Sequence, residues 1–547
     1  MANKLRILPL GGLGEIGKNM MLFEYGNNSL LVDTGLMFPE NDMLGIDYII
    51  PDFRYVLDKK DTVRGVIITH GHEDHTGAIK HVMAELDAPI YATSLTRGLL
   101  EVKLRDAKLY DRVKLNTIQA GDRTHIGPFE VEFFHVCHSI PDGVGMGITT
   151  PAGLIVHSGD FKFDHTPVDG WPTDYAKLAE FSGRGVLALL SDSTNADKAG
   201  WTPSEAVIDP AFDQVFREAP GRILIATFAS LISRIQQVAN AAFRHGRKMA
   251  LVGTSMVENA KMAQKLGYLE VPDGLIVPTE EALKMAPKKV AIMTTGTQGE
   301  PSSILGRLSE GRNRQFDLLP KDTVVLSSHP IPGNEEMVHR TINKLLQRGA
   351  RVIYDPIAPV HVSGHASAEE MKLLIHLVKP KNFVPIHGEL RHLTQHAAIA
   401  RELGIPDENI AVVENGTVLE FEDGRLKVGE RIPGGYVYVD GTGVGDIGPS
   451  VMREREALAE GGVVIVNLRV SKAGQIVGKP EILTRGFVFV RESESLFEAA
   501  QTEIASAAAK ANGNMGEKVQ QRLADFFYAE TKRRPVIFTL VNEVGNG

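Results

Sequence analysis

The chain has 547 residues, 43% of them hydrophobic and 23% charged, which is an ordinary globular composition at a length that predicts three or so domains. No apolar run reaches the roughly 18 residues that a membrane-spanning helix needs, and the first residues lack the apolar core of a signal peptide. The single cysteine, Cys137, excludes an internal disulfide framework. A soluble, cytoplasmic protein without a membrane partner is expected.

The net charge of −9 argues at first against a nucleic-acid substrate, because phosphate binding favours a basic surface. The charge is unevenly distributed, however. Residues 205–350 hold 18 Lys and Arg against 15 Asp and Glu, and residues 451–547 hold 13 against 12. The acidity is therefore concentrated in the other segments, which also contain the candidate metal ligands, so the charge does not exclude a nucleic-acid substrate.

Short β-rich runs alternate with turn residues through residues 1–204. Two of them, 66–70 (VIITH) and 154–160 (LIVHSGD), are continuously apolar and then end abruptly in polar side chains. Strands buried between two layers have this pattern, with functional side chains at their carboxyl ends. Helical patterns such as residues 76–86 lie between the runs, so we expect an α/β region with αββα layers.

The strongest local pattern is a cluster of potential metal ligands directly after the first of these runs. Residues 70–75 read His-Gly-His-Glu-Asp-His, which places His70, His72, Asp74 and His75 on one tight turn before a helix. Imidazole and carboxylate groups suit zinc and manganese, and a turn lets them diverge towards two metal positions. The alternative is a polar loop that is His-rich by chance, which this spacing disfavours.

Three more polar residues follow apolar strands in the same region. Asp33 closes the run SLLVD, His138 follows FEVEFFHVC, and Asp160 follows LIVHSG. Taken singly, each has a simpler interpretation as a turn carboxylate or a hydrogen-bonded histidine at a strand end. Their joint occurrence favours a metal centre at one edge of the layered sheets. Two divalent ions about 3.5–4 Å apart would activate a shared water for hydrolysis without a covalent enzyme intermediate.

Three neighbouring residues of suitable type are expected to be structural. His157 lies three residues before Asp160 on a strand, so alternation turns its side chain to the opposite face. His135 is interpreted in the same way. Cys137 adjoins His138, and strand alternation turns its thiol away from the candidate metals into the core.

The pattern changes near residue 205. Residues 205–350 alternate strands and helices as a separate parallel α/β unit, whereas 351–430 again place histidines at the ends of apolar runs. The first domain is therefore expected to be interrupted by an insertion at 205–350 and to resume at 351–430. A Gly-rich stretch at 431–450 is expected to be a linker, and 451–547, with strands 461–470, 486–490 and 536–544, a small α/β module.

The HxHxDH pattern resembles the signature of the metallo-β-lactamase fold. Asp192 in SDSTNA, His365 in HVSGHAS and His387 in IHGE match three further motifs of the β-CASP nucleases, whose cap domain is inserted at this point of the chain. Within that group the chain resembles the ribonuclease J family along its whole length, through segments such as LPLGGLGEIGKNM, LVDTGLMFPE, HSGDFKFD, TTGTQGEPSS and RGFV. The tRNA 3′-end processing nucleases share HxHxDH but lack this insertion.

The resemblance implies a set of metal ligands. One ion would be held by His70, His72 and His138 and a second by Asp74, His75 and His387, with Asp160 bridging them and Asp33 supporting the ligand turn. Two divalent ions per chain are expected, zinc being favoured in a structure and manganese or magnesium being possible for activity.

The resemblance also implies catalytic roles for Asp74, His365 and Asp192. In this family His365 would donate to the scissile phosphate, and Asp192 would orient a ligand histidine. The simpler interpretations are a loop histidine before a helix for His365 and a turn aspartate for Asp192.

Enzymes of this family cut RNA internally and also degrade it from a 5′-monophosphate end, in RNA processing and decay. A pocket for that phosphate is expected to need hydroxyl and N–H groups close to the metals. The proposed pocket residues are Ser230 and Arg234 from the inserted domain and the loop Ser363, Gly364, His365, Ala366 and Ser367. Ser367 is equally well interpreted as a helix cap, and Arg234 as a solvated helix residue.

Single-stranded RNA is the expected substrate, and a homodimer or homotetramer formed through residues 451–547 the expected assembly. Two other classes stay open. The chain could be a catalytically silent RNA-binding subunit, although every expected ligand is present. It could also be a small-molecule metallo-hydrolase, which needs neither the inserted domain nor the C-terminal module.

Overall fold

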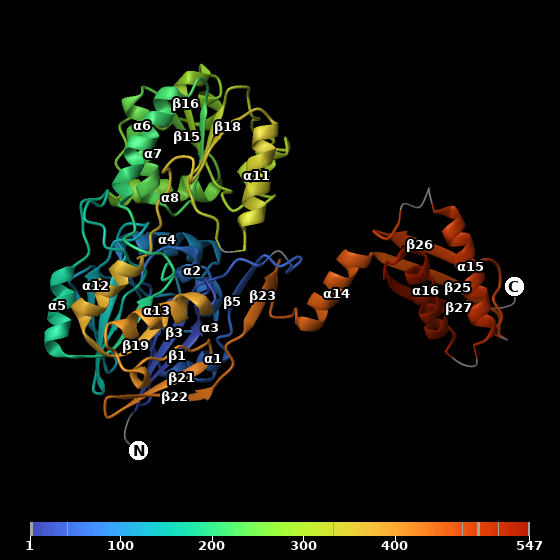
Figure 1. Ribbon diagram of the computed structural model, residues 1–547, viewed down its shortest axis with the longest axis horizontal. Helices are drawn as coiled ribbons and strands as arrows, with labels where there is room; N and C mark the ends of the chain where they lie inside the picture. The colour runs from blue at the N-terminus through green and yellow to red at the C-terminus, as the bar shows by residue number, and fades with distance from the viewer. Residues whose placement is uncertain are drawn as a thin grey trace. The chain divides into compact units, whose positions relative to one another are not determined.

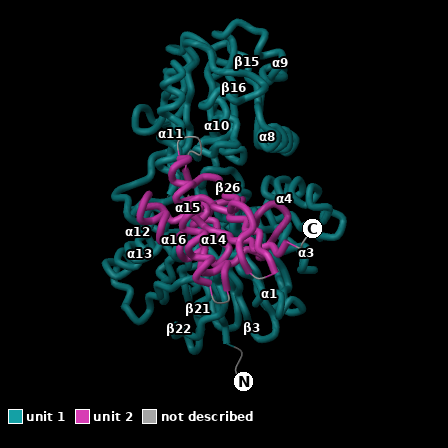
Figure 2. Tube along the Cα trace, turned by 90° about the vertical axis from the view of Figure 1, so that its right-hand side faces the viewer, with its two compact units in different colours: residues 1–40, 48–437 teal, residues 41–47, 438–547 magenta. Residues whose placement is uncertain are grey.

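The computed structural model describes residues 4–40, 42–331, 333–472, 474–488, 493–511 and 514–544. The chain divides into two compact units, residues 1–40 with 48–437 and residues 41–47 with 438–547, which are coloured separately in Figure 2. Each unit has its own hydrophobic core. None of the helices in the described ranges is long and apolar enough to cross a membrane.

Two β-sheets form the centre of the first unit (Figure 1). The eight-stranded sheet has the order β22 (Arg425–Arg431), β21 (Thr417–Glu422), β1 (Leu5–Gly11), β3 (Met20–Tyr25), β4 (Asn28–Val32), β6 (Val63–Ile67), β7 (Ile90–Ala92) and β8 (Leu115–Thr117). The six-stranded sheet has the order β19 (Pro380–Ile386), β13 (Val186–Asp192), β12 (Gly153–His157), β11 (Val144–Thr150), β10 (Phe129–His135) and β9 (Arg123–Ile126).

One apolar core fills the space between these sheets. Phe23 and Leu30 of the first sheet and Phe133, Ile155 and Leu190 of the second belong to the same buried cluster. The outer face of the six-stranded sheet packs on helices α5 (Tyr175–Arg184), α12 (Ala368–Val378) and α13 (Leu390–Glu402). The remaining helices of this part are α1 (Arg54–Asp58), α2 (Glu73–Thr76), α3 (Ile79–Glu85) and α4 (Ser94–Asp106). The expected αββα layers are therefore present.

The interruption of this sandwich is a five-stranded parallel sheet. Its order is β15 (Lys248–Leu251), β16 (Val290–Thr294), β14 (Ile223–Ala226), β17 (Thr323–Leu326) and β18 (Arg351–Ile353). Separate apolar clusters cover its two faces, with helices α6 (Ile208–Glu218), α7 (Ile232–Arg244), α8 (Thr254–Leu266), α9 (Thr279–Ala282), α10 (Ile304–Ser309) and α11 (Glu335–Gln347). Strand β18 belongs to this sheet although it lies beyond the expected boundary at residue 350.

The second unit packs a three-stranded sheet on two helices. The sheet has the order β26 (Glu481–Arg485), β25 (Val463–Val470) and β27 (Val536–Glu543), and its core-facing side meets α15 (Glu494–Ala509) and α16 (Met515–Thr531). The prediction of a strand at 486–490 is wrong for residues 486–488, which the structure describes outside any strand. Its place is taken by β26, which pairs antiparallel with β25, and Phe489 and Val490 lie outside the described residues.

The expected linker at 431–450 contains secondary structure. Strands β23 (Tyr436–Asp440) and β24 (Gly443–Val444) form a hairpin there, and helix α14 (Pro449–Gly461) begins before its end. The glycines of this stretch form tight turns, since Gly441 and Gly445 have φ angles of 59° and 74°. A glycine-rich composition therefore marks a hairpin here.

Candidate metal centre

The ligand turn follows strand β6 and enters α2. A backbone hydrogen bond fixes this turn against the segment that follows β4: Leu36 N–H donates to the Glu73 carbonyl over 3.0 Å. The Asp74 carbonyl accepts from the backbone N–H and the side-chain amide of Asn19, both over 3.0 Å. A Cβ on Gly35 would lie 1.6 Å from the same carbonyl oxygen, so only glycine fits beside the turn.

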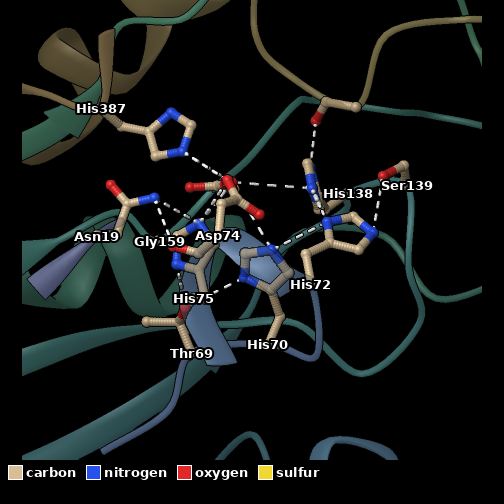
Figure 3. Close-up of polar contacts among 12 residues, drawn as sticks. Asn19, Thr69, His70, His72, Asp74, His75, His138, Ser139, Gly159 and His387 are labelled. Carbon is tan, nitrogen blue, oxygen red and sulfur yellow. Dashed lines mark hydrogen bonds and ion pairs between the residues drawn. The ribbon is translucent and has the colours of Figure 1, made fainter. Parts of the chain in front are cut away.

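Three imidazoles converge on one point at the first group of ligands (Figure 3). His70 Nε2 and His138 Nε2 each lie 3.1 Å from His72 Nδ1. The outer nitrogens of two rings are already used, because His138 Nδ1 donates to the Gly364 carbonyl over 2.7 Å and His70 Nδ1 meets the Thr69 hydroxyl over 3.1 Å. Their Nε2 lone pairs are therefore directed at the same small space, which suits a cation.

The second group combines two imidazoles and two carboxylates. Asp74 Oδ2 lies 3.4 Å from His75 Nε2 and 3.2 Å from His387 Nε2. Asp160 Oδ2 lies 3.1 Å from His75 Nε2 and 3.6 Å from His387 Nε2. The ligating atoms of these four residues all lie within 4.8 Å of one another. This mixed nitrogen and oxygen set fits zinc or manganese better than a cation that requires only oxygen ligands.

Asp160 joins the two groups. Its Oδ2 atom lies 3.7 Å from His70 Nε2 and 3.8 Å from His138 Nε2, in addition to its contacts with His75 and His387. One carboxylate oxygen is therefore surrounded by imidazole nitrogens from both groups, which is the position a bridging ligand requires. Asp160 comes from the loop that directly follows β12, as its place after an apolar run predicts.

Outer hydrogen bonds hold the second group of rings in one tautomer. His75 Nδ1 donates to Asp33 Oδ2 over 2.8 Å, and Asp33 also accepts from Thr69 N–H over 2.8 Å. His387 Nδ1 donates to the Thr194 hydroxyl over 2.6 Å, and that hydroxyl donates to Asp192 Oδ1 over 2.7 Å. Both Nε2 atoms therefore face the carboxylates. Such outer partners orient ligands and raise their basicity.

The pKa values of these groups follow from burial and from their neighbours. Burial and the positive charge of neighbouring histidines hold the pKa values of His70 and His138 well below the ordinary value, so both rings are neutral ligands at pH 7. Burial also lowers the pKa of His75 and His387, but Asp160 and Asp74 raise both well above it. A divalent cation takes the place of that proton when it binds, so affinity should rise with pH.

His365 lies beside the metal centre without belonging to its main groups. Its Nδ1 donates to Asp192 Oδ2 over 2.7 Å, and its ring meets that of His138 edge-on with centroids 4.8 Å apart. Burial lowers the pKa of His365, but the Asp192 carboxylate outweighs that effect and raises it. Asp192 therefore serves two histidines, His365 directly and His387 through Thr194.

The metal centre opens into a cavity of about 1260 Å³ within the first unit. Its lining includes Asp74, His138, Asp160, His365 and His387 from the sandwich. The inserted domain contributes the facing wall, for example Phe228, Ser230 and the segment after β17. Drug-sized ligands occupy roughly 300–1,000 Å³, so this space accommodates a longer substrate.

The loop 363–367 differs from the predicted anion site. The Ser367 hydroxyl is part of a capping box with Glu370 at the start of α12 and also contacts the Thr202 hydroxyl over 2.9 Å. The N–H groups at this helix start are used internally: Ser367 N–H donates to Glu370, Ala368 N–H to the Lys198 carbonyl, and Glu369 N–H to the Gly200 carbonyl. These contacts give Ser367 and the N–H groups internal partners, and Ser367 also lines the cavity, so phosphate binding by this loop stays a prediction.

Two other members of the predicted pocket also have internal roles. Ala366 is fully buried, and its N–H donates to the Phe161 carbonyl over 2.7 Å. Gly364 packs on His138, because a Cβ there would lie 2.6 Å from His138 Nδ1. Its small size serves the close approach of the ligand ring and not that of a phosphate.

Arg234 is wrong as an RNA-binding residue. Its side chain is completely buried under the inserted domain's surface. The guanidinium pairs with Glu205 over 2.9 Å, donates to the Val360 carbonyl over 2.8 Å and contacts Gln237 and Ser327. A buried, fully paired arginine cannot reach a substrate without breaking this network.

Ser230, Ser363 and His365 line the cavity, as Gly364 and Ser367 also do. Within the described ranges the Ser230 hydroxyl makes no side-chain hydrogen bond. The Ser363 hydroxyl accepts from Asn195 over 2.8 Å and from His365 N–H over 3.2 Å, so its own proton stays available.

His135, His157 and Cys137 have structural contacts, as the sequence predicts. His135 donates to the Pro172 carbonyl over 2.9 Å and stacks on Trp171 with ring centroids 3.9 Å apart. His157 Nδ1 accepts from Gly159 N–H over 3.1 Å. Cys137 is buried, and burial raises the pKa of its thiol.

Asn19 and Thr194 are site residues that the sequence analysis missed. Both act on ligands far away in the chain, with Asn19 separated from Asp74 by 55 positions and Thr194 from His387 by 193. Each lies inside a segment that carries the family resemblance, GEIGKNM and SDSTNA, and that is the signal that would have found them.

The fold and the site together define a metal-dependent hydrolase of the metallo-β-lactamase class with an inserted domain. Four family descriptions match consecutive parts of the chain: Metallo-beta-lactamase superfamily (residues 13–202), Ribonuclease J, beta-CASP domain (220–345), Zn-dependent metallo-hydrolase RNA specificity domain (349–412) and Ribonuclease J C-terminal domain (450–544).

Full-length relatives agree with these matches. Ribonuclease J2 of Bacillus subtilis (strain 168) is 41% identical and covers 99% of each chain. Ribonuclease J of Thermus thermophilus is 42% identical over 97% of this chain and 92% of its own, and that of Synechocystis 45% over 90% and 77%. The chain belongs to the ribonuclease J family, metal-dependent ribonucleases of this fold.

A solved structure resembles the fold alone. A protein of unknown function from Enterococcus faecalis V583 is 17% identical, with a TM-score of 0.54 over 76% of this chain and 100% of that one.

Proposed function

We propose that this chain is a metal-dependent ribonuclease of RNA processing and decay that combines 5′-to-3′ exonuclease activity, with a preference for a 5′-monophosphate, and endonuclease activity. Family membership supports the reaction class. The observation that carries the proposal is the His/Asp cluster, whose unused lone pairs open into a cavity large enough for a polymer. A cytoplasmic location fits an RNA substrate and the lone reduced cysteine, Cys137.

Two divalent ions per chain are proposed, one held by His70, His72 and His138 and the other by Asp74, His75 and His387, with Asp160 between them. Zinc fits the donor set, and manganese or magnesium are candidates for activity. When bound, such a pair supplies a water of lowered pKa and stabilises charge on a phosphoryl oxygen.

His365 and Asp192 are proposed to handle the substrate side of the reaction. Asp192 holds the His365 ring through Nδ1, so Nε2 is the ring atom left to donate a proton to an oxygen of the scissile phosphate. The raised pKa of His365, which its carboxylate partner causes, keeps that proton in place near neutral pH. Asp74, whose side chain is 31% exposed, lines the cavity and contacts His75 of the same group.

The terminal 5′-phosphate is proposed to bind where Ser230 and Ser363 face the cavity beside His365. Hydroxyl donors suit a phosphate oxygen, and Ser363 is held by Asn195 with its proton unused. Ser363→Ala should therefore reduce the preference for monophosphate over triphosphate ends. Ser367→Ala is the comparison variant, because that hydroxyl caps α12 and contacts Thr202.

A homodimer or homotetramer is proposed to form through the outer face of the sheet in the second unit. Leu483, Phe538 and Leu540 on that face are 63%, 52% and 53% exposed, which is unusual for large apolar side chains of one three-stranded sheet. A Phe538→Glu/Leu540→Glu variant should lower the oligomer mass in light scattering. The equally exposed Phe243 of α7 provides the control, Phe243→Glu, and an unchanged mass in the double variant contradicts this interface.

One experiment tests the activity and its direction together. The chain is incubated with Mn²⁺ or Mg²⁺ and one labelled RNA carrying either a 5′-monophosphate or a 5′-triphosphate. Mononucleotides released preferentially from the monophosphate, with internal fragments from both, are expected. RNA that is bound but never cut would favour a catalytically silent subunit, and RNA that is neither bound nor cut would favour a small-molecule hydrolase.

A further inference from the structure

Phe38 is an exposed aromatic residue on the wall of the cavity. Its side chain is 44% exposed, and it lines the same cavity as Asp74 and Glu73. Exposed single apolar residues are common on protein surfaces. This one lines the cavity into which the candidate metal centre opens, where a phenyl ring offers no ligand atom to a metal ion.

The backbone that leads into Phe38 is fixed. Leu36 N–H donates to the Glu73 carbonyl over 3.0 Å, and Met37 N–H donates to the Ile49 carbonyl over 2.8 Å. The side chains of Leu36 and Met37 are each only 8% exposed, so they anchor the segment in the core. Phe38 is thereby presented to the cavity from a rigid position.

The position of Phe38 is close to the ligand turn. Phe38 comes two positions after Leu36, whose N–H donates to the Glu73 carbonyl, and two residues of extended chain span at most about 7 Å. Glu73 precedes the ligand Asp74. A substrate whose phosphate lies at the metal centre therefore has its adjoining nucleotide within reach of the Phe38 ring.

We propose that Phe38 is a base-stacking residue that holds the nucleotide next to the scissile phosphate. This role rests on the proposed RNA substrate. A phenyl ring offers an RNA strand no partner for its phosphates and only a flat apolar face for a base. Stacking tolerates every base because each has a π-face, which suits a nuclease that must proceed through any sequence.

Binding of a single-stranded RNA to the full chain tests the proposal, measured by fluorescence anisotropy with a chelator present so that the RNA stays intact. Phe38→Ala should weaken binding by about 5- to 100-fold, the effect expected from one stacked base. Phe38→Trp should bind as well as the wild type. Phe243→Ala, in which an equally exposed phenylalanine outside the cavity is removed, should leave binding unchanged.

A substrate series identifies the base. In a series of RNAs, one abasic nucleotide is moved along the strand. At one position it should weaken binding to the wild type but leave the affinity of Phe38→Ala unchanged. Equal losses at that position in both proteins, or wild-type binding by Phe38→Ala, would overturn the stacking role while RNA binding stands. A wild-type chain that binds no RNA would overturn the ribonuclease proposal itself, and the role of Phe38 with it.

Discussion

The metal centre and the loop 363–367 lie side by side in one cavity wall and are equally rich in polar groups, yet they use those groups differently. In the metal centre, the outer atoms of three rings are bonded to Gly364, Asp33 and Thr194, which turns their inner Nε2 atoms towards the neighbouring His and Asp side chains. In the loop, Ser367 and the first N–H groups of α12 bond to one another and to neighbouring carbonyls.

The difference shows that residue type alone does not make a binding site. A polar group acts on a ligand only if some of its hydrogen-bonding capacity is left over in the direction of the ligand. His70 and His138 have such capacity, whereas Ser367 has used its own on the helix. The following changes test this distinction, beginning with the largest expected effect.

Replacing Asp74 and His75 together by Ala should abolish the metal centre. We expect RNA cleavage to fall by at least about a thousand-fold, since groups that act as one unit in catalysis are lost together. Circular dichroism should show an intact fold. His165→Ala/Asp169→Ala, at two exposed positions of the same domain, is the control with full activity. Retained cleavage in the first variant would contradict the hydrolytic mechanism.

Thr194→Val should weaken metal binding without removing a ligand. The hydroxyl that joins His387 Nδ1 to Asp192 is lost, so the ring is free to rotate away from Asp74. Loss of such an outer partner typically costs about 10- to 100-fold in metal affinity. Competition with a chromogenic chelator measures it, and Thr194→Ser should restore the wild-type value. If the Thr194→Val variant binds metal as tightly as the wild type, the Thr194 hydroxyl does not orient His387.

Asn19→Ala should loosen the ligand turn by a smaller factor. Its side-chain amide holds the Asp74 carbonyl, but the backbone N–H of residue 19 keeps its own bond to the same atom. We expect metal affinity to fall less than in Thr194→Val, in the same chelator assay. Asn415→Ala is a suitable control, because that amide bonds Glu15 and the Leu13 N–H and no proposed ligand. A larger loss than for Thr194→Val would reverse this order.

His396 is as deeply buried as the ligands but lies outside the metal clusters. Burial lowers its pKa to about 3, against 6.5 in the unfolded chain. The unfolded state therefore takes up a proton between these values that the folded state does not, so stability is complete above pH 6.5 and falls as the pH is lowered. His396→Gln should reduce the slope of unfolding free energy against pH between 4 and 6 by about 1.4 kcal/mol per pH unit. Denaturant titrations at several pH values measure the unfolding free energy. The same dependence on pH in the wild type and in His396→Gln would contradict this.

Ser367→Ala should cost stability alone. Loss of an N-cap hydroxyl typically lowers the free energy of unfolding by about 1 kcal/mol. The ratio of cleavage rates on monophosphate and triphosphate RNA should not change, because the hydroxyl only serves α12 and Thr202. A changed ratio would show that Ser367 takes part in phosphate binding, and the contrast between the loop and the metal centre would not hold.

The layers, the insertion and the clustered His and Asp residues were predictable because each left a local pattern. Buried strands read as continuous apolar runs, and His70 to His75 are consecutive. Ser367 could not be assigned from the sequence, because the same residues favour a helix cap and an anion site, and only tertiary contacts show that it caps α12. Arg234 reads as a surface residue until Glu205 and Val360 cover it. The strand Glu481–Arg485 (EILTR) has only two apolar residues, so the more apolar 486–490 was favoured as the strand instead.

Metal stoichiometry tests the account of the site most directly. The full chain is stripped with a chelator and titrated with Zn²⁺ by isothermal calorimetry, with bound metal counted independently after gel filtration. We predict two equivalents per wild-type chain, and weaker or fewer equivalents in the Asp74→Ala/His75→Ala variant. A single equivalent in the wild type, or binding that this variant leaves unchanged, would contradict the two-metal centre around Asp160.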